Sequence, residues 1–190
     1  NIWLLLLILT SIISYLEFYN LIKKIFKKQR NKIYFLNIIC ICYLTFFTYA
    51  AFDFAKFTPD IFLVLLICIF SDIGGYIVGK TIGGKKLTKI SPNKTVAGTI
   101  GSFIFSIIPI VILSDFFTNL LDTSLLGILI FTIFISFICQ SGDLFISYFK
   151  RKAKVKDSGA VLPGHGGILD RIDGILFAIP TAFIISEIIS

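Results

Sequence analysis

Long apolar runs are the feature that most constrains this chain. Each of six runs is long enough to cross the hydrocarbon core of a bilayer, which takes about 20 residues. They cover residues 2–22, 34–55, 59–79, 96–114, 123–145 and 171–189. Hydrophobic residues make up 56% of the 190-residue sequence, more apolar surface than one soluble domain can bury. The sequence therefore predicts a polytopic membrane protein with about six transmembrane helices, forming one domain over residues 1–190.

Basic residues are distributed unevenly between the loops that join these runs. Seventeen of the 18 Lys and Arg residues lie in or beside three alternate loops, at about 23–33, 80–95 and 146–169. Because loops rich in Lys and Arg stay in the cytoplasm, we expect these three loops on the cytoplasmic face. The first loop has no glycine, motif or carboxylate, and we interpret it as a topology signal in contact with anionic lipid.

The segment 71–102 combines glycines with lysines. It contains seven glycines in 32 residues, and glycine lets backbone N–H groups surround an anion. Ser91 and Pro92, followed by Lys94, predict a turn that leads into a helix N-terminus, a common phosphate position. An alternative interpretation is that some of the glycines only allow helices to pack closely, namely Gly74, Gly75, Gly98 and Gly101.

Four carboxylates lie in or at the ends of apolar runs. Asp72 is inside the third run, where a carboxylate indicates function by default, although a structural ion pair would also explain it. Asp143 is near the end of the fifth run, and Asp170 and Asp173 open the sixth. Helix N-termini favour negative charge, which could explain one of these residues. Three carboxylates beside a basic, glycine-rich loop fit a Mg²⁺–phosphate site better.

The one histidine of the chain, His165, lies between glycines beside this acidic cluster. No second histidine exists to complete a zinc site, and the four cysteines lie inside apolar runs. We therefore expect His165 to donate to a phosphate or to transfer a proton.

A long pattern joins these residues and resembles the signature of the CDP-diacylglycerol synthase, or phosphatidate cytidylyltransferase, family. It reads Ser147-x-x-Lys150-Arg151-x4-Lys156-Asp157-x-Gly159-x-x-Leu162-Pro163-x-His165-Gly-Gly-Ile168-x-Asp170-Arg171-Ile172-Asp173. Two upstream segments are also similar to the family, as is Glu17-Phe18-Tyr19 more weakly. The upstream segments are Asp72-x-x-Gly75-Tyr76-x-x-Gly79-Lys80 and Ser91-Pro92-x-Lys94-Thr95-x-x-Gly98.

The resemblance implies an all-α fold, usually in a homodimer, in the bacterial inner membrane. It also implies the reaction of CTP with phosphatidic acid, a membrane lipid, and a Mg²⁺ ion, with a second cation as an option, held by Asp143 and Asp170. Asp173 is a further candidate metal ligand, and no nucleic-acid partner is expected. We assign catalytic roles to Asp143, Lys150, Asp170 and His165. The substrate-binding candidates are Asp72, Tyr76, Lys80, Ser91, Lys94, Ser147, Arg151, Lys156, Asp157 and Arg171.

The chain departs from the family in two respects. Ala97 stands where the family commonly has Glu, and the chain is shorter than usual, so we expect that N-terminal helices are missing. The alternatives are a CTP-dependent polyprenol or dolichol kinase, a CDP-alcohol phosphatidyltransferase, and a transporter or membrane scaffold. The phosphatidyltransferase motif needs two more aspartates after Gly174, which the chain lacks. Transport is disfavoured because charge is concentrated in the loops.

Overall fold

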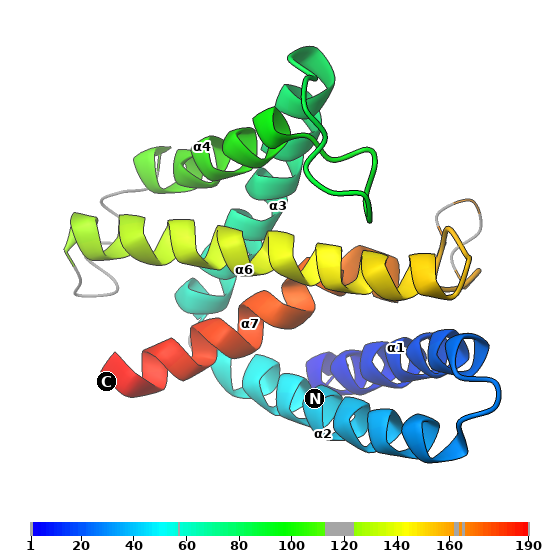
Figure 1. Cartoon of the computed structure of the whole chain (residues 1–190). Coiled ribbons are helices and arrows are strands. Elements are labelled where there is room, and N and C mark those ends of the chain that lie inside the picture. The colour runs from blue at the N-terminus through cyan, green and yellow to red at the C-terminus, as the bar shows by residue number, and fades with distance from the viewer. Residues whose placement is uncertain (1, 57, 113–123, 162–163, 165, 190) are drawn as a thin grey trace.

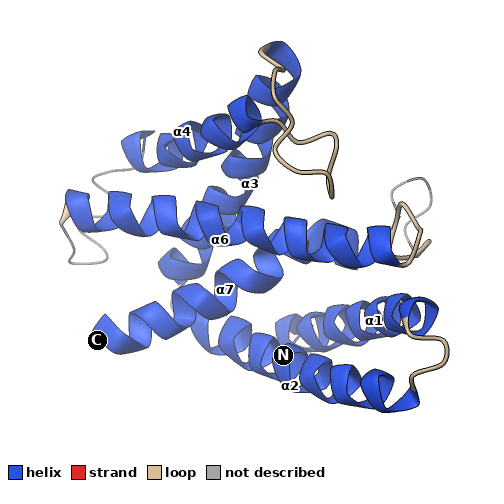
Figure 2. Ribbon diagram, viewed as in Figure 1, coloured by secondary structure: helices blue, strands red, loops and turns tan. Residues whose placement is uncertain are grey.

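The computed structural model describes residues 2–56, 58–112, 124–161, 164 and 166–189, and this part of the chain forms six helices without a strand (Figure 1, Figure 2). The predicted all-α fold is confirmed. The helices are α1 (Ile2–Ile25), α2 (Arg30–Phe54), α3 (Thr58–Thr81), α4 (Val96–Ile112), α6 (Leu125–Lys152) and α7 (Leu169–Ile189).

Helix α6 runs through the middle of the molecule (Figure 1). Helices α3 and α4 pack against each other and against α6, and α7 also packs against α6. The hairpin of α1 and α2 lies beyond α7, which α2 contacts directly. Fully buried side chains such as Ile67 of α3, Ile135 of α6 and Ala178 of α7 form the core. The arrangement leaves the two helix pairs α3–α4 and α6–α7 facing each other.

Each predicted apolar run corresponds to one helix. Four helices are long and apolar enough to cross a membrane, namely α1, α2, α3 from Asp60 onward, and α6. Helix α4 is shorter, and α7 begins with charged residues. Large hydrophobic side chains such as Trp3 and Phe35 are exposed, as expected where lipid is the solvent. This is an integral membrane protein.

Glycines allow α3 and α4 to approach closely. A Cβ atom added at Gly74 would lie 2.5 Å from the carbonyl oxygen of Gly101, and one added at Gly101 would lie 2.5 Å from Val78 Cβ. The close-packing interpretation of these glycines is therefore confirmed. Gly83 and Gly84 differ, because they have φ angles of 64° and 88° and open space around them. They form the turn at which the chain leaves α3.

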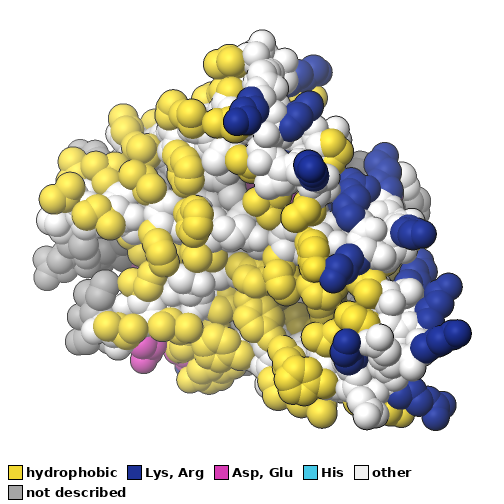
Figure 3. Space-filling view, viewed as in Figure 1, with side chains coloured by type: hydrophobic (Ala, Val, Ile, Leu, Met, Phe, Trp, Pro, Cys, Tyr) yellow, Lys and Arg dark blue, Asp and Glu magenta, His cyan; other side chains and the backbone are white. Residues whose placement is uncertain are grey.

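The three basic loops lie at the same side of the molecule. The α1–α2 loop and the segment after α6 are at one end of the view in Figure 1, and the loop before α4 extends toward the same side. Figure 3 shows most Lys and Arg side chains of this face along that edge, with many hydrophobic side chains on the remainder of the described surface. The alternation of the loops that the sequence predicts is thus present in the fold.

Candidate active site

A cavity of about 440 Å³ opens between α3, α4, α6 and α7. Four carboxylates and three basic side chains line it: Asp72, Asp143, Asp170, Asp173, Lys94, Lys150 and Arg171. Tyr76 and Ser91 are also on its wall. Nine of the residues that the sequence singles out therefore meet at one place, although they come from segments separated by about a hundred positions.

Lys94 is positioned by the loop that precedes α4. The backbone amide of Leu87 donates to the Lys94 carbonyl at 2.9 Å, and the amide of Val96 donates to the Lys85 carbonyl at 3.0 Å. Thr95 then caps the helix, because its hydroxyl accepts from the Gly98 amide at 3.0 Å. This is the turn into a helix N-terminus that the sequence predicts.

The Lys94 ammonium forms an ion pair with Asp143 across the cavity, between the α4 side and α6. Both side chains remain about a third exposed, at 27% and 31%. Ser147, one turn further along α6, donates its hydroxyl to Asp143 Oδ1 at 3.2 Å. Asp143 is thus held by one cation and one hydroxyl, and solvent reaches it. It lies inside α6 rather than at the helix end, because α6 continues to Lys152.

Asp170 is held more tightly than Asp143. Lys150 Nζ lies 2.7 Å from Asp170 Oδ1, and the two side chains are only 12% and 10% exposed. Asp170 Oδ2 accepts from the backbone amides of Ser158 at 2.8 Å and Gly167 at 3.0 Å. Partial burial alone would raise the pKa of Asp170, but the hydrogen bonds from Lys150 and these two amides outweigh it and lower the pKa below its usual range. The carboxylate is therefore fixed in its charged form.

Glu17 of α1 supports the same segment and was not among the predicted site residues. Its side chain is 4% exposed and accepts from the backbone amides of Ile168 at 3.1 Å and Leu169 at 2.9 Å. These amides open α7 and have no partner inside the helix. The signal for Glu17 was a carboxylate inside the first apolar run, within the weak family match.

Ser158 connects Glu17 to Asp170. Its hydroxyl oxygen lies 2.8 Å from Glu17 Oε2 and 2.9 Å from Asp170 Oδ2. A serine hydroxyl has one proton, so it donates to one of the two carboxylates at a time. The cavity wall at Asp170 is therefore tied through Ser158 to helix α1.

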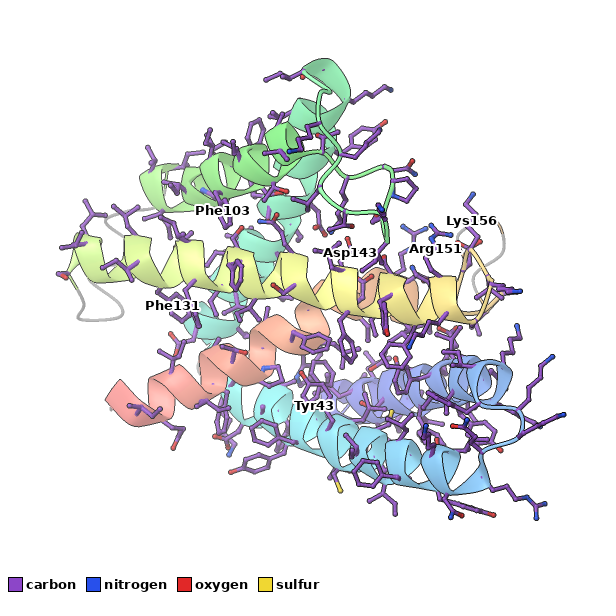
Figure 4. The ribbon with its side chains drawn as sticks, viewed as in Figure 1. Tyr43, Phe103, Phe131, Asp143, Arg151 and Lys156 are labelled. Carbon is purple, nitrogen blue, oxygen red and sulfur yellow. The ribbon has the colours of Figure 1, made fainter. Side chains whose placement is uncertain are left out.

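Five predicted residues do not line the cavity. Ser147 supports Asp143 from α6, and Lys80 Nζ lies 3.3 Å from the Tyr76 hydroxyl on the exposed side of α3. Arg151 Nε donates to the Ile90 carbonyl at 3.2 Å and joins α6 to the loop before α4. Figure 4 shows Asp143 and Arg151 toward that loop, whereas Lys156 lies beyond the end of α6.

Asp157, the fifth, lines a different cavity, formed with the end of α1. His165, Leu162 and Pro163 lie outside the described residues, so the prediction for His165 stays a prediction.

A sequence model described as the cytidylyltransferase family matches residues 1–189. The chain belongs to this family. It is 48% identical over 122 residues to the phosphatidate cytidylyltransferase of Staphylococcus haemolyticus, which covers 63% of this chain and 46% of that protein. It is 40% identical over 131 residues to the phosphatidate cytidylyltransferase of Bacillus subtilis, covering 68% and 48%. The chain spans about half the length of these curated relatives.

The carboxylates of this cytidylyltransferase-family cavity fit a Mg²⁺ ion that is bound together with a phosphate ligand. Among the described residues no three Asp, Glu, Cys or His side chains are grouped closely enough to hold a metal alone. Mg²⁺ usually takes one or two protein carboxylates and completes its shell with water and substrate phosphates. Asp143 and Asp170 both line the cavity, which gives it the number of carboxylates that this mode of binding uses.

Proposed function

We propose that this chain carries the active site of a phosphatidate cytidylyltransferase, which transfers the cytidylyl group of CTP to phosphatidic acid and gives CDP-diacylglycerol and pyrophosphate. The observation that carries the proposal is the single cavity lined by four carboxylates and three cations. It draws on both glycine-containing basic segments, and two substrates with phosphate groups need cations from two sides. Both relatives are named phosphatidate cytidylyltransferases, which supports the same reaction.

The proposed step is an in-line displacement at the α-phosphorus of CTP. A phosphate oxygen of phosphatidate forms the new O–P bond, and the bond between the α-phosphorus and the bridging oxygen to the β-phosphate breaks, so that pyrophosphate leaves. No protein nucleophile is needed, and catalysis consists of positioning and charge neutralisation. Lys94, Lys150 and Arg171 are the cations at hand on the cavity wall.

Lys94 and Lys150 also form ion pairs with two of the cavity carboxylates. Each is paired with a carboxylate, Lys94 with Asp143 and Lys150 with Asp170, so each ammonium is already held at the cavity. Asp143 and Asp170 would hold a Mg²⁺ ion, with Asp173 as a further candidate ligand, and the ion would supply positive charge toward the phosphates of CTP. Lys94, whose ion pair is partly exposed, would meet a phosphate oxygen, and Lys150 would supply positive charge from its fixed place beside Asp170. His165 remains a candidate donor to the leaving pyrophosphate.

The proposal includes the location and assembly of the protein. The three basic loops would face the cytoplasm of a bacterial cell, because positive charge is retained on that side of the inner membrane. The cavity would then receive CTP from the cytoplasm and phosphatidate from the adjacent leaflet. A homodimer is part of the same proposal, and its support is the family resemblance.

Labelled CTP separates this function from its main rival, a CTP-dependent polyprenol or dolichol kinase. The purified chain in detergent micelles receives CTP labelled at either the α- or the γ-phosphate, with phosphatidic acid or a polyprenol as acceptor. Cytidylyl transfer places the α-label in the lipid and the γ-label in pyrophosphate. Lipid that carries the γ-label would identify a kinase and refute the proposal, and no transfer to either lipid would favour a non-catalytic scaffold.

A pair of lysines in one loop tests whether the loop before α4 belongs to the site. Lys94→Ala should lower cytidylyl transfer by roughly tens- to thousands-fold, because a cation that meets a phosphate is removed. Lys89→Ala, in the same loop but away from the cavity wall, is the matched control and should retain activity. Equal rates for the two variants in steady-state kinetics would exclude this loop from the site.

A further inference from the structure

A second cavity of about 750 Å³ lies at the same edge of the molecule, between the end of α1 and the segment 157–160. Lys23, Lys24 and Lys27 line it from the α1 side, together with the amide side chain of Asn20. From the other side it is lined by Asp157, Ser158, Gly159 and Ala160. The first basic loop, which we interpret from the sequence as a topology signal in contact with anionic lipid, therefore contributes to a concave surface.

The three lysines concentrate positive charge at this cavity. Lys23 and Lys24 are neighbours in the last turn of α1, and Lys27 follows two residues after the helix ends, so three like charges lie close together and repel one another. Across the described residues, no carboxylate lies within ion-pair distance of any of the three. The carboxylate of Asp157 on the opposite wall offsets one charge at most, so the cavity retains a net positive charge that an anion would neutralise.

We propose that this cavity is a binding site for a phosphate group, distinct from the active-site cavity, and that its ligand is the headgroup of an anionic phospholipid. Lys23 and Lys24 lie in the last turn of α1, a helix long and apolar enough to span the membrane. Their ammonium groups are thus at the depth where lipid phosphates lie. Clusters of basic residues directly beside a transmembrane helix bind anionic headgroups.

The position of the site gives it a structural link to Asp170. Ser158 lines the lysine cavity, its amide donates to Asp170, which lines the active-site cavity, and its hydroxyl oxygen lies 2.9 Å from the same carboxylate. The two cavities are therefore separated by one residue and its hydrogen bonds. A headgroup held by the lysines would rest against the segment that fixes Asp170.

Thermal unfolding of the detergent-solubilised chain, titrated with phosphatidylglycerol, tests this site without any use of cytidylyl transfer. Ligands that bind the folded state raise the unfolding temperature, and at a given concentration a tighter ligand raises it further. Phosphatidylglycerol should stabilise the chain and phosphatidylcholine should not. The triple variant Lys23→Gln, Lys24→Gln, Lys27→Gln should weaken the apparent affinity by roughly tenfold or more.

The same loop supplies a matched control. Lys28→Gln, Arg30→Gln, Lys32→Gln removes three charges from exposed positions outside the cavity, and it should change the affinity by about twofold or less. The single variant Lys24→Gln covers the case in which the triple variant does not fold, and it should weaken binding by a few-fold. Equal losses in the two triple variants, or equal stabilisation by both lipids, would overturn the proposal.

Inorganic phosphate and pyrophosphate form the last arm of the titration. Failure of both to displace phosphatidylglycerol at millimolar concentration supports the lipid headgroup as the ligand. Displacement that depends on the three cavity lysines supports the phosphate site but assigns it to a soluble ligand. Because the readout is binding, a failure here leaves the proposed enzymatic activity standing, and the reverse also holds.

Discussion

The two ion pairs of the active-site cavity have the same chemistry and different surroundings. Lys94 and Asp143 join the α4 side to α6, remain about a third exposed, and have one further hydrogen bond, from Ser147. Lys150 and Asp170 are about a tenth exposed and belong to a network that includes two backbone amides and Ser158. One wall of the cavity is thus open to exchange of partners, and the other is fixed before any ligand arrives.

The difference separates two roles that carboxylates can have at one site. An exposed ion pair contributes little to stability, typically about 0–1 kcal/mol, so Lys94 and Asp143 can part at low cost. Breaking a buried pair by removal of one partner costs about 3–5 kcal/mol. We therefore expect Asp143 to act mainly in binding and catalysis, and Asp170 to act in both catalysis and folding.

The largest expected effect comes from replacing each aspartate in turn. Asp143→Asn and Asp170→Asn should both lower cytidylyl transfer by about a hundredfold or more, because each removes a charged oxygen ligand. Only Asp170→Asn should also lower the free energy of unfolding, by about 3 kcal/mol. Asp143→Asn should change it by about 1 kcal/mol or less. Activity assays and denaturation of the same preparations measure both, and equal loss of stability would break the comparison.

Glu17 tests how far the fixed wall extends. Glu17→Ala should lower the free energy of unfolding by about 2–3 kcal/mol, because the amides of Ile168 and Leu169 lose their acceptor in a buried place. Glu17→Gln is the control, since its amide oxygen still accepts hydrogen bonds, and it should cost clearly less. Hydrogen exchange of these two amides checks the cause. Exchange that stays as slow in Glu17→Ala as in the original chain would show that α1 does not support this wall.

The two serines give the smallest effects. Ser158→Ala should cost about 1–2 kcal/mol of stability, because a buried hydroxyl that serves two carboxylates is lost. Ser147→Ala should cost less than about 1 kcal/mol, since its bond to Asp143, which is about a third exposed, is easily replaced by water. Thermal unfolding of the two variants side by side provides the measurement. A larger cost for Ser147→Ala would reverse the assignment of the open and fixed walls.

Much of the fold and of the cavity is predictable from local patterns. The apolar runs give the helices, because a span needs about 20 apolar residues. The polar residues of 71–102 and 143–173 indicate the cavity. A charged residue in an apolar run is energetically costly in a membrane, so its presence points to a functional site. The end of α6 was placed too early, since Lys150, Arg151 and Lys152 end the apolar run but continue the helix. Positively charged side chains in the last turn of a helix interact favourably with the helix dipole, so these three residues are compatible with a longer α6.

Two features could not be read from the sequence. Lys80 and Lys156 belong to the family-like segments, but neither lines the cavity, and side-chain direction is a property of the tertiary arrangement. Glu17 contacts Ile168 and Leu169, which follow it in the sequence by 151 and 152 positions. No local sequence pattern reveals contacts over such a separation. The asymmetry of the two ion pairs has the same origin, because burial depends on which helices come together.

The contacts of Glu17 also have a consequence for the order in which the protein is made. At a synthesis rate of about 5–20 residues per second, α7 follows α1 by on the order of ten seconds. During that interval Glu17 has been made, but the amides that hold it in the finished fold, those of Ile168 and Leu169, have not. The α3–α4 pair, by contrast, can close as soon as α4 has been made, because the two helices follow each other directly in the chain. Newly made α1 must therefore keep a carboxylate hydrated or shielded until α7 arrives, which makes docking of α7 the step that buries Glu17 among its hydrogen-bond donors.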